Sequence, residues 1–359
     1  MAKNANLKAA KEAQNDEFYT QYDDIQKEIN AYLEYNPDLF RGKIILLPCD
    51  DPEWSNFTKF FAQNFEFFGL RRLISTSFAQ ASKIFKTDWQ PTLFETQNPL
   101  YDADRSEVCG KIFILDRDTN GDSRINIHDL EWQYLKGTGD FRSDEVTRLR
   151  DEVDLIITNP PFSLFREFMD WLVESGKQFA VIGTINALSY RNIFPLIQAN
   201  RLWLGATGVK PKVFLTPTGA PHKMGNTCWY TNIEHGRRHR PLSLLSMAEN
   251  KKYSKHPLIR IHGYLRYDNY DAIDVPYIDA IPSDYEGMMG VPISFVDKYC
   301  PEQFEILGMT DRDSPHITKK YTRENYKNYS DLNRRGVIII DGIPKSTYPR
   351  LLIRKRKQQ

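Results

Sequence analysis

The chain has 359 residues, enough for two domains or for one large α/β domain with an additional region. Its 48 basic and 47 acidic side chains nearly cancel, so any surface for nucleic acid must come from local segregation of charge. No apolar run reaches membrane-spanning length and no signal-peptide core is present, so we expect a cytoplasmic protein without a membrane partner. The four cysteines lie far apart without a Cys-x-x-Cys pair, which disfavours a zinc site and indicates a reduced chain.

The first part of the chain alternates between predicted helices and strands. Hydrophobic periodicity predicts a helix over 22–35 and buried strands over 43–47 and 71–78. After the first of these strands, Ser55 stands where a helix N-cap is expected, because phenylalanines follow it at helical spacing. This order of elements is typical of an α/β sheet.

Residues 105–135 are open to two interpretations. Four side chains have the ligand spacing of an EF-hand-like calcium loop, namely Asp118, Asn120, Asp122 and Asp129. Ser123 occupies the position where that loop needs glycine. The alternative, which we favour, is a β-hairpin with strands over 111–115 and 124–127 around the turn Asn120-Gly121. The hairpin requires no metal.

The most informative stretch is 154–162. Apolar and β-branched side chains over 154–158 predict a buried parallel strand. The strand must end at Pro160 and Pro161, because neither residue can donate a ladder hydrogen bond. The period of an amphipathic helix follows, with Ser163 expected as its N-cap. In open α/β sheets ligands bind outside the carboxyl ends of such strands.

The polar tip of this strand has the groups needed to hold a planar amine. Asn159 offers a side-chain carbonyl and Pro160 offers a backbone carbonyl, so two acceptors can face one amino group. Phe162 adds a flat apolar face for an aromatic ring. Held in this way, the amine turns its lone pair toward a third partner. The alternative is an ordinary strand that ends in a proline turn.

The remaining elements complete a mixed sheet of about seven strands. Periodicity predicts a helix over 190–200 and a short helix over 301–307. Four further strands are predicted over 178–185, 201–205, 212–216 and 228–232.

Charge segregates strongly after residue 234. Between His235 and Tyr267 there are eight Lys or Arg residues and one acid, Glu249, interleaved with aromatic side chains and histidines. That pattern predicts contacts with phosphates, although a solvated basic face has the same composition. The predicted DNA contacts are Arg237, Arg238, Arg240, Lys251, Lys252 and Lys255. Residues 268–297 are acidic and contain no Lys or Arg, so they are expected to pack as an extended segment.

Six short motifs, in this order, resemble the EcoRI-type adenine-specific DNA methyltransferases. They are DEFYTQYDDI (16–25), CDDPEWSNF (49–57), GDFRS (139–143), NPPFSLF (159–165), YDNYDAI (267–273) and GVPISF (290–295). The resemblance implies a class I, Rossmann-like α/β fold with a mixed sheet flanked by helices. It implies a catalytic domain over 1–234, with 105–135 as an elaboration, and a DNA-recognition region over 235–359. The implied reaction moves a methyl group from S-adenosylmethionine, leaving S-adenosylhomocysteine, to N6 of an adenine flipped out of duplex DNA.

The same resemblance assigns site residues. Catalysis is expected at Asn159, Pro160, Pro161 and Phe162. Cofactor contacts are expected from Phe18, Tyr19, Thr20, Asp50, Asp51, Ser55, Thr76, Phe78, Asp140, Phe141 and Asn159. Within that set, Asp140 would accept a hydrogen bond from the adenine amino group of the cofactor, with Phe141 stacking beside it. The chain departs from most relatives in having no glycine-rich turn after its first strand and no acid at the end of its second strand.

Two other functions use the same features. An RNA or protein-glutamine methyltransferase could have the same tip, because an amide is also a planar amine. A non-catalytic DNA-binding protein would need only the basic stretch. We favour DNA methylation because the tip is intact and the C-terminal region is large. We further expect a monomeric protein, encoded by a prokaryote or a phage, in either of two settings: a restriction-modification system with a cognate restriction endonuclease, or orphan modification without one.

Overall fold

The computed structural model describes residues 19–52, 55–79, 99–216, 220–324, 326 and 329–357. The chain divides into two compact units. The first comprises Met1–Phe194 with Leu202–Gly236, and the second comprises Pro195–Arg201 with Arg237–Gln359. The sequence predicts one domain boundary, after residue 234. In the structure, residues 195–201 also group with the C-terminal unit. Within the described residues, no helix combines the length and the apolar character needed to cross a membrane.

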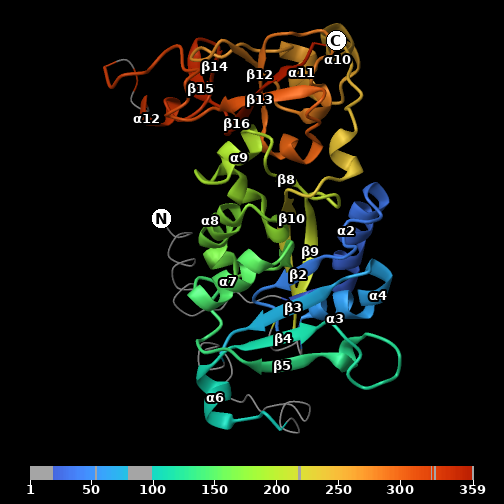
Figure 1. The fold of residues 1–359 in the computed structure, drawn as a ribbon. Helices are drawn as coiled ribbons and strands as arrows, with labels where there is room; N and C mark the ends of the chain where they lie inside the picture. Colours follow the sequence, from blue (N-terminus) through green and yellow to red (C-terminus); the bar gives the residue numbers. More distant parts are fainter. Residues whose placement is uncertain are drawn as a thin grey trace. The chain divides into compact units, whose positions relative to one another are not determined.

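A mixed sheet forms the centre of the first unit (Figure 1). Its strands are β1 (Tyr19–Thr20), β2 (Ile44–Leu47), β3 (Arg72–Ser77), β4 (Lys111–Leu115), β5 (Glu131–Tyr134), β6 (Leu155–Thr158), β7 (Gln178–Thr184), β8 (Trp203–Leu204), β9 (Lys210–Leu215) and β10 (Pro221–Thr231). In the described chain the order is β1-β9-β10-β7-β6-β2-β3-β4-β5, with β8 paired to β10. The fold class predicted from the sequence is confirmed, and the sheet, with 10 strands, is larger than the predicted seven.

The middle of this sheet is parallel. Strand β2 pairs in parallel with β3 and with β6, and β6 pairs in parallel with β7. All four residues of β6 are buried, as the apolar run over 154–158 predicts for a strand covered on both faces. Because these strands run in the same direction, their carboxyl ends meet at one border of the sheet, which we call the carboxyl edge.

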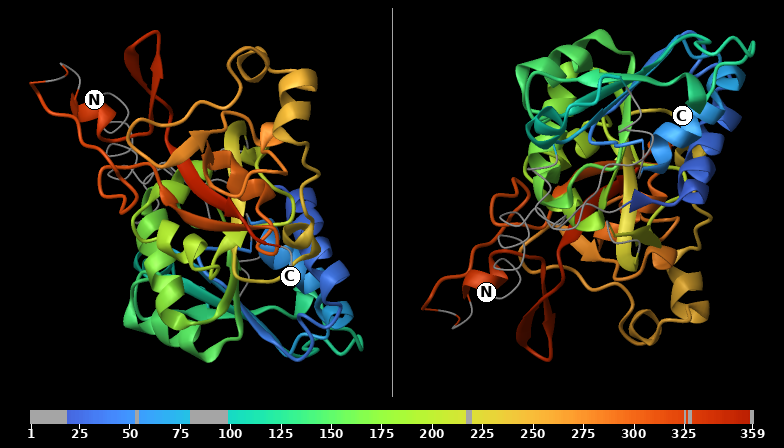
Figure 2. Two further views of the ribbon diagram at one scale, coloured as in Figure 1. Left: turned by 90° about the horizontal axis from the view of Figure 1, so that it is seen from above. Right: turned by 90° about the horizontal axis from the view of Figure 1, so that it is seen from below.

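Helices cover both faces of the sheet. The helices of the first unit are α2 (Tyr22–Tyr35), α3 (Asn56–Gln63), α4 (Phe65–Phe68), α6 (Ala103–Val108), α7 (Asp144–Glu152) and α8 (Phe165–Ser175), and α9 (Phe194–Gln198) belongs to the second unit from Pro195 on. Figures 1 and 2 show α2 and α3 on one face, and α7 and α8 on the other. The helix predicted over 22–35 is confirmed with the same bounds. Its buried side chains join those of α3 and the central strands in one core cluster.

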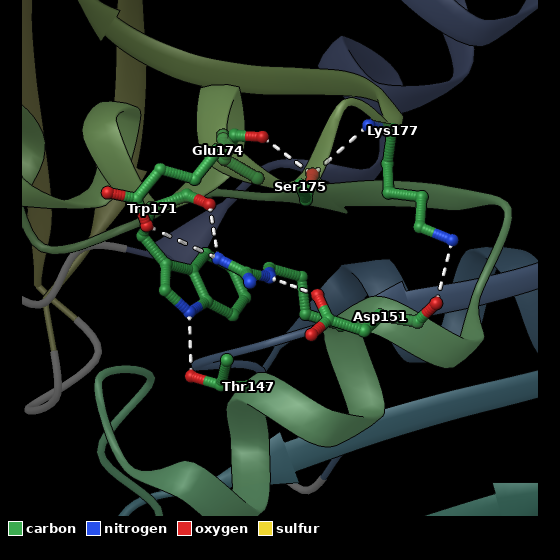
Figure 3. Close-up of polar contacts among 8 residues, drawn as sticks. Thr147, Asp151, Trp171, Glu174, Ser175 and Lys177 are labelled. Carbon is green, nitrogen blue, oxygen red and sulfur yellow. Dashed lines mark hydrogen bonds and ion pairs between the residues drawn. The ribbon is translucent and has the colours of Figure 1, made fainter.

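A polar latch fastens α7 to α8 (Figure 3). The buried Arg150 donates from NH1 to the Trp171 carbonyl at 2.7 Å, and its guanidinium lies 5.1 Å from the Trp171 ring centre. Trp171 Nε1 donates to Thr147 Oγ1 at 3.1 Å, and Lys177 Nζ donates to the Asp151 carbonyl at 2.7 Å. The latch therefore fixes the helix that directly follows the predicted tip.

The segment after β4 is a hairpin, but its second strand is not the predicted one. Lys111 pairs with Tyr134 and Ile114 pairs with Glu131, so the partner of β4 is β5 rather than 124–127. The residues between the strands form a loop in which carboxylates accept the backbone amides. Asp118 accepts from Gly121 and Ser123, and Asp129 accepts from Thr119, Asn120 and Asn126. The two carboxylates therefore satisfy backbone amides of the loop that have no partner in the β-ladder. The described residues contain no group of three or more metal-ligating side chains.

The second unit has its own small sheets (Figure 1). A four-stranded sheet has the order β11-β12-β16-β13, from Ala272–Asp274, Met288–Pro292, Arg350–Lys355 and Phe304–Met309. A separate hairpin joins β14 (Val337–Ile340) to β15 (Ile343–Ser346). The helices are α10 (Met247–Tyr253), α11 (Pro257–His262) and α12 (Tyr329–Leu332).

The short helix predicted over 301–307 is wrong. Strand β13 begins at Phe304, and its side chains alternate at first between buried and half-buried, with Phe304 and Ile306 inside. Apolar runs this short fit either period, and pairing with β16 decides in favour of the strand.

Candidate active site at the carboxyl edge

The tip of β6 is tied to the neighbouring strand. Thr158 Oγ1, which is buried, donates to the carbonyl of Pro48 at 2.5 Å, just beyond the end of β2. Asn159 is half-buried and Pro160 is buried at the point where β6 stops. A short 3₁₀ turn, Phe162–Leu164, then leads into α8. Ser163 lies inside that turn and is not the predicted N-cap, because α8 begins only at Phe165.

Phe162 rests on the core of the first unit. Its ring lies edge-on to that of Phe214, with the ring centres 6.0 Å apart and the planes at 83°. Phe214 is fully buried in β9, and Phe162 itself is half-buried and packs against the main core cluster. The aromatic ring at the tip is therefore supported by the core and retains an accessible part.

The turn after β2 is built around a buried carboxylate. Asp50 is 2% exposed and accepts hydrogen bonds from the Thr58 amide at 3.0 Å, the Thr58 hydroxyl at 2.5 Å and the Ser55 hydroxyl. Ser55 also caps α3 by accepting from the Phe57 amide at 3.2 Å, so the predicted N-cap is confirmed. Burial raises the pKa of Asp50 to about 6, against the lowering effect of the hydrogen bonds from Ser55 and Thr58.

This arrangement explains how the turn forms without glycine. Cys49 takes up the left-handed conformation, with φ of 60°. The carboxylate of Asp50 is occupied within the protein by the first turn of α3. Asp51 is only half-buried, and its backbone carbonyl accepts from the Ser55 amide at 2.7 Å.

The segment containing Asp140 lies against the end of β3. A Cβ atom on Gly139 would come within 2.3 Å of the Ser77 carbonyl oxygen, and Gly139 has φ of +83°. Only glycine permits this close approach. The Ala79 amide donates to the Thr138 carbonyl at 2.8 Å. Thr76 is buried in β3 and Phe78, just after that strand, is half-buried.

Arg142 forms a bidentate ion pair with the Asp140 carboxylate. Its Nε donates to Oδ1 at 2.9 Å and its NH2 donates to Oδ2 at 2.6 Å. The third nitrogen, NH1, donates to Glu167 Oε2 on α8 at 2.8 Å. Burial tends to raise the pKa of Asp140, but the hydrogen bonds from Arg142 outweigh it and hold that pKa below its ordinary value. Arg142 was not among the predicted site residues, although it stands within the GDFRS motif.

Phe141 lies in the core rather than at the surface of the edge. Its side chain is fully buried, with ring centres 4.9 Å from Phe168 and 5.7 Å from Trp171 in edge-to-face contacts. A stacking role beside the cofactor requires an accessible ring face, which Phe141 does not have in this structure. The sequence could not distinguish an aromatic residue beneath α8 from one at the surface.

The N-terminal motif reaches the same edge through β1. Phe18 lies outside the described residues. Tyr19 and Thr20 pair with Leu215 and Phe214 of β9, and Asn56 Nδ2 donates to the Thr20 carbonyl at 2.7 Å. Thr20 therefore lies next to the first residue of α3.

Two buried hydroxyls near this edge have unused hydrogen-bonding capacity. Thr20 Oγ1 and Thr76 Oγ1 are buried, and neither has a hydrogen-bond partner among the residues that the structure describes. A buried hydroxyl left in this way costs about 1–3 kcal/mol, so such groups are commonly completed by a ligand or water.

The six basic residues predicted to contact DNA fall into different environments in the second unit. Arg237 NH2 bonds to Asp297 Oδ2 at 2.7 Å, and the buried Arg238 donates to Asn200 Oδ1. Both side chains are engaged inside the unit and form little of its accessible basic surface. Lys255 is exposed but pairs with Asp279 at 2.8 Å. The other three, Arg240, Lys251 and Lys252, are exposed.

Helices α10 and α11, which we call the helix pair, present an exposed basic surface. A capping box of Ser246 and Glu249 starts α10, and Pro257 at the first turn starts α11. Lys251, Lys252 and Arg260 are exposed and have no ion-pair partner in the described part of the chain. Tyr253 and Ile261 are 65% and 69% exposed. Cations interleaved with exposed apolar side chains are typical of a nucleic-acid surface.

The chain matches the model of one protein family, described as adenine-specific methyltransferase EcoRI, over residues 6–356. It is similar to three type II methyltransferases. M.EcoRI of Escherichia coli is 35% identical over 87% of this chain and 94% of its own length. M.MgeORF184P of Mycoplasma genitalium is 32% identical over 97% of this chain and 98% of its own. M.MpnI of Mycoplasma pneumoniae is 30% identical over 97% of both chains. No solved structure matches the chain significantly.

Proposed function

Because the chain belongs to the EcoRI family of adenine-specific methyltransferases, we propose that it methylates N6 of adenine within a specific sequence of duplex DNA, using S-adenosylmethionine. Its relatives are named type II methyltransferases, so we further propose that it acts beside a cognate restriction endonuclease. The observation that carries the proposal is the bond from Thr158 to Pro48, which joins the Asn159-Pro160 tip to the turn where a cofactor would lie.

The tip supports capture of an exocyclic amine. The side-chain carbonyl of Asn159 and the backbone carbonyl of Pro160 would each accept one N–H of the adenine amino group. Phe162 would stack on the base, and its contact with Phe214 supports the ring from behind. An adenine inside a duplex cannot reach such a tip, so it would be flipped out at a cost of a few kcal/mol.

The carboxyl edge fits the proposed cofactor. The buried hydroxyls of Thr20 and Thr76 are groups that a ligand would complete. Asp140, kept charged by Arg142, would accept from the adenine amino group of the cofactor, with Phe78 on the neighbouring strand. When bound, S-adenosylmethionine would supply an electrophilic methyl group on a sulfonium.

The two carboxylates after β2 differ in their suitability as ligands. Asp50 is occupied by the first turn of α3, so we assign it to holding that turn in place. Asp51 is the carboxylate we propose for the amino group of the cofactor, with Tyr19, Thr20 and Ser55 nearby in the chain's cofactor motifs.

Positioning would account for most of the rate enhancement. Asn159 Oδ1 and Pro160 O would orient the amine with its lone pair facing the methyl group, and holding two reactants in this geometry lowers the barrier by several kcal/mol. In this step the N–C bond would form as the S–C bond breaks and the neutral thioether leaves. No strong base is needed, because the amine attacks as a neutral group and the methylated amine, once positively charged, is acidic enough to lose its extra proton to water.

DNA binding is proposed for the helix pair of the second unit and for Arg240, which precedes it in the chain. Lys251, Lys252 and Arg240 are accessible to phosphates, whereas Lys255 would first have to leave Asp279. The protein is proposed to act as a monomer.

Sequencing of genomic DNA from cells that express the protein tests this proposal. We expect N6-methyladenine at every copy of one short sequence, and far less of it in cells that express the Asn159→Ala variant. The modified sequence would also give the recognition site. Absence of methylated adenine in DNA, with methylation of RNA or of protein glutamine instead, would replace the DNA proposal with one of those alternatives.

A further inference from the structure

The second unit contains a cavity of about 360 Å³ away from the helix pair in sequence. It is lined by Arg312, Ile317, Lys320, Tyr329, Ser330 and Asn333. The volume lies near the lower end of the roughly 300–1,000 Å³ typical of ligand sites. We call it the Arg312 cavity. Its lining residues come from the segment 312–320 and from α12 with the residue that follows it, so two stretches of chain close on one space.

Both walls of the Arg312 cavity are held by polar contacts within the second unit. Asn333 fixes α12 to Tyr321 in both directions, accepting from its amide and donating to its carbonyl, each at 2.8 Å. Asn269, 1% exposed, accepts from the Thr318 amide through its backbone carbonyl at 3.0 Å. Its side chain accepts from the Val337 amide at 2.8 Å. The walls are therefore preorganised before any ligand arrives.

The charges in the cavity are complementary to an anion. Arg312 and Lys320 are exposed, and neither has an ion-pair partner among the described residues. No carboxylate lines the cavity. Three acids adjoin the lining residues in sequence, namely Asp311, Asp313 and Asp331. They weaken the positive field without occupying the cavity.

Lys319, next to Lys320 in the chain, is paired with a carboxylate, in contrast to Lys320. Lys319 bonds to Asp268 Oδ2 at 2.5 Å, and Tyr321 donates to the same oxygen at 2.6 Å. The acid next to this wall is thus already neutralised, and Lys320, one residue further, stays available. Ser330 adds a hydroxyl, and Tyr329, 37% exposed, adds an aromatic face. Two cations, a hydroxyl and a ring are the groups that hold a phosphodiester with its sugar or base.

We propose that the Arg312 cavity binds one backbone phosphate of the substrate DNA, an inference that rests on the proposed function. Arg312 and Lys320 hold the same phosphate from two sides, and Tyr329 packs against the adjoining sugar or base. The cavity is a second DNA contact, separate in sequence from the helix pair, and it fixes the register of the unit on the duplex without reading bases.

Binding of duplex DNA to the full chain, measured by fluorescence anisotropy over a series of salt concentrations, tests this. Arg312→Ala and Lys320→Ala should each weaken binding about tenfold, the loss expected for one hydrogen bond to a charged group. Because both cations serve one phosphate, the double variant should flatten the logarithmic salt slope by about one unit and not by two. Arg323→Ala, which removes an exposed cation that does not line the cavity, should change neither quantity.

A duplex with a single uncharged methylphosphonate, moved along the site, identifies the phosphate. At one position the methylphosphonate should weaken DNA binding by the parent protein and leave DNA binding by the double variant unchanged. An equal loss from Arg323→Ala, an unchanged double variant, or no position with this selectivity would overturn the inference. Calorimetry with adenosine monophosphate is the second arm: tight binding that does not compete with DNA would make the cavity a site for free nucleotide instead. If the parent protein binds no DNA at all, the proposed function itself fails.

Discussion

The carboxyl edge of the first unit and the basic stretch 237–267 of the second differ in what fixes their side chains. At the edge, Asn159 comes just after β6 and Asp50 comes soon after β2, and the neighbours of these strands are set by backbone ladders. In the basic stretch, position depends on which acid or amide each cation finds. Arg237 and Arg238 turn inward, while Lys251 and Lys252 point to solvent.

This difference teaches that a motif built into a strand ending carries its own geometry, whereas a run of charge does not. The parallel ladder brings the ends of β2, β3, β6 and β7 together wherever the side chains point. A basic composition constrains only the number of cations, because each long side chain can reach many partners. The following predictions test that contrast, beginning with the largest effect.

Changing Asn159 should produce the largest loss. Asn159→Ala removes one of two proposed acceptors for the target amine and should lower single-turnover methyl transfer on the order of 10²-fold or more. Asn159→Asp, which keeps an oxygen in the same place, should lose much less. Non-specific affinity for DNA should stay close to that of the parent protein. Equal rates for the alanine variant and the parent would remove the tip from the reaction.

The buried Asp50 should give stability a measurable pH dependence. Its pKa is raised from 3.8 to about 6 in the folded protein, so the folded state binds the proton more tightly than the unfolded chain. Stability from this group is therefore complete below about pH 4 and is lost as pH rises to 6, by about 3 kcal/mol. Asp50→Asn removes this titration, so its unfolding free energy relative to the parent should increase by about that amount between pH 4 and pH 7. Urea unfolding across this range measures the difference, and parallel curves would contradict the burial argument.

The basic stretch should separate into two classes of cation. Changing Lys251 and Lys252 together to alanine should flatten the salt slope of DNA binding by about two units, with little change in melting temperature. Changing Arg237 and Arg238 together should leave the salt slope nearly unchanged and lower the melting temperature. The reason is that Asp297 and Asn200 lose these partners, at a cost of about 1–3 kcal/mol each. If the arginine pair altered the slope as much as the lysine pair, accessibility would not decide which cations meet phosphate.

The acidic loop between β4 and β5 should show the smallest effect. Its backbone amides are already satisfied by Asp118 and Asp129, so the hairpin needs no ion to hold its shape. Melting temperature and methyl transfer should be the same in EDTA and in calcium. A fall in melting temperature in EDTA, restored by calcium and not by magnesium, would support the EF-hand interpretation instead.

Much of the fold follows from local sequence because the strands beside the edge are buried on both faces. Continuous apolar runs gave β2, β3, β6 and β7 to within a few residues. The N-cap at Ser55 was predictable for the same reason that it works, since a hydroxyl before a helix accepts an orphan amide. These features depend on neighbours that are close in sequence.

Other features depend on contacts that the sequence does not express. The partner of β4 was misplaced because carboxylates in the loop, rather than the Asn120-Gly121 turn, take up the amides. Phe141 and Arg142 are adjacent, yet one enters the core and the other bridges Asp140 and Glu167. The inward direction of Arg238 is set by Asn200, which stands 38 residues away. Such long-range pairs appear only when the chain has folded.

The most direct test of the account is the chemical identity of the methylated product. The full-length protein would be mixed in single turnover with methyl-labelled S-adenosylmethionine and duplex DNA, in parallel with RNA and with protein acceptors, and the products digested and separated by mass spectrometry. The account predicts label in N6-methyladenine from duplex DNA, greatly reduced in the Asn159→Ala variant. Label in another product, or in N6-methyladenine at equal rates with Asn159 and with alanine at this position, would contradict it.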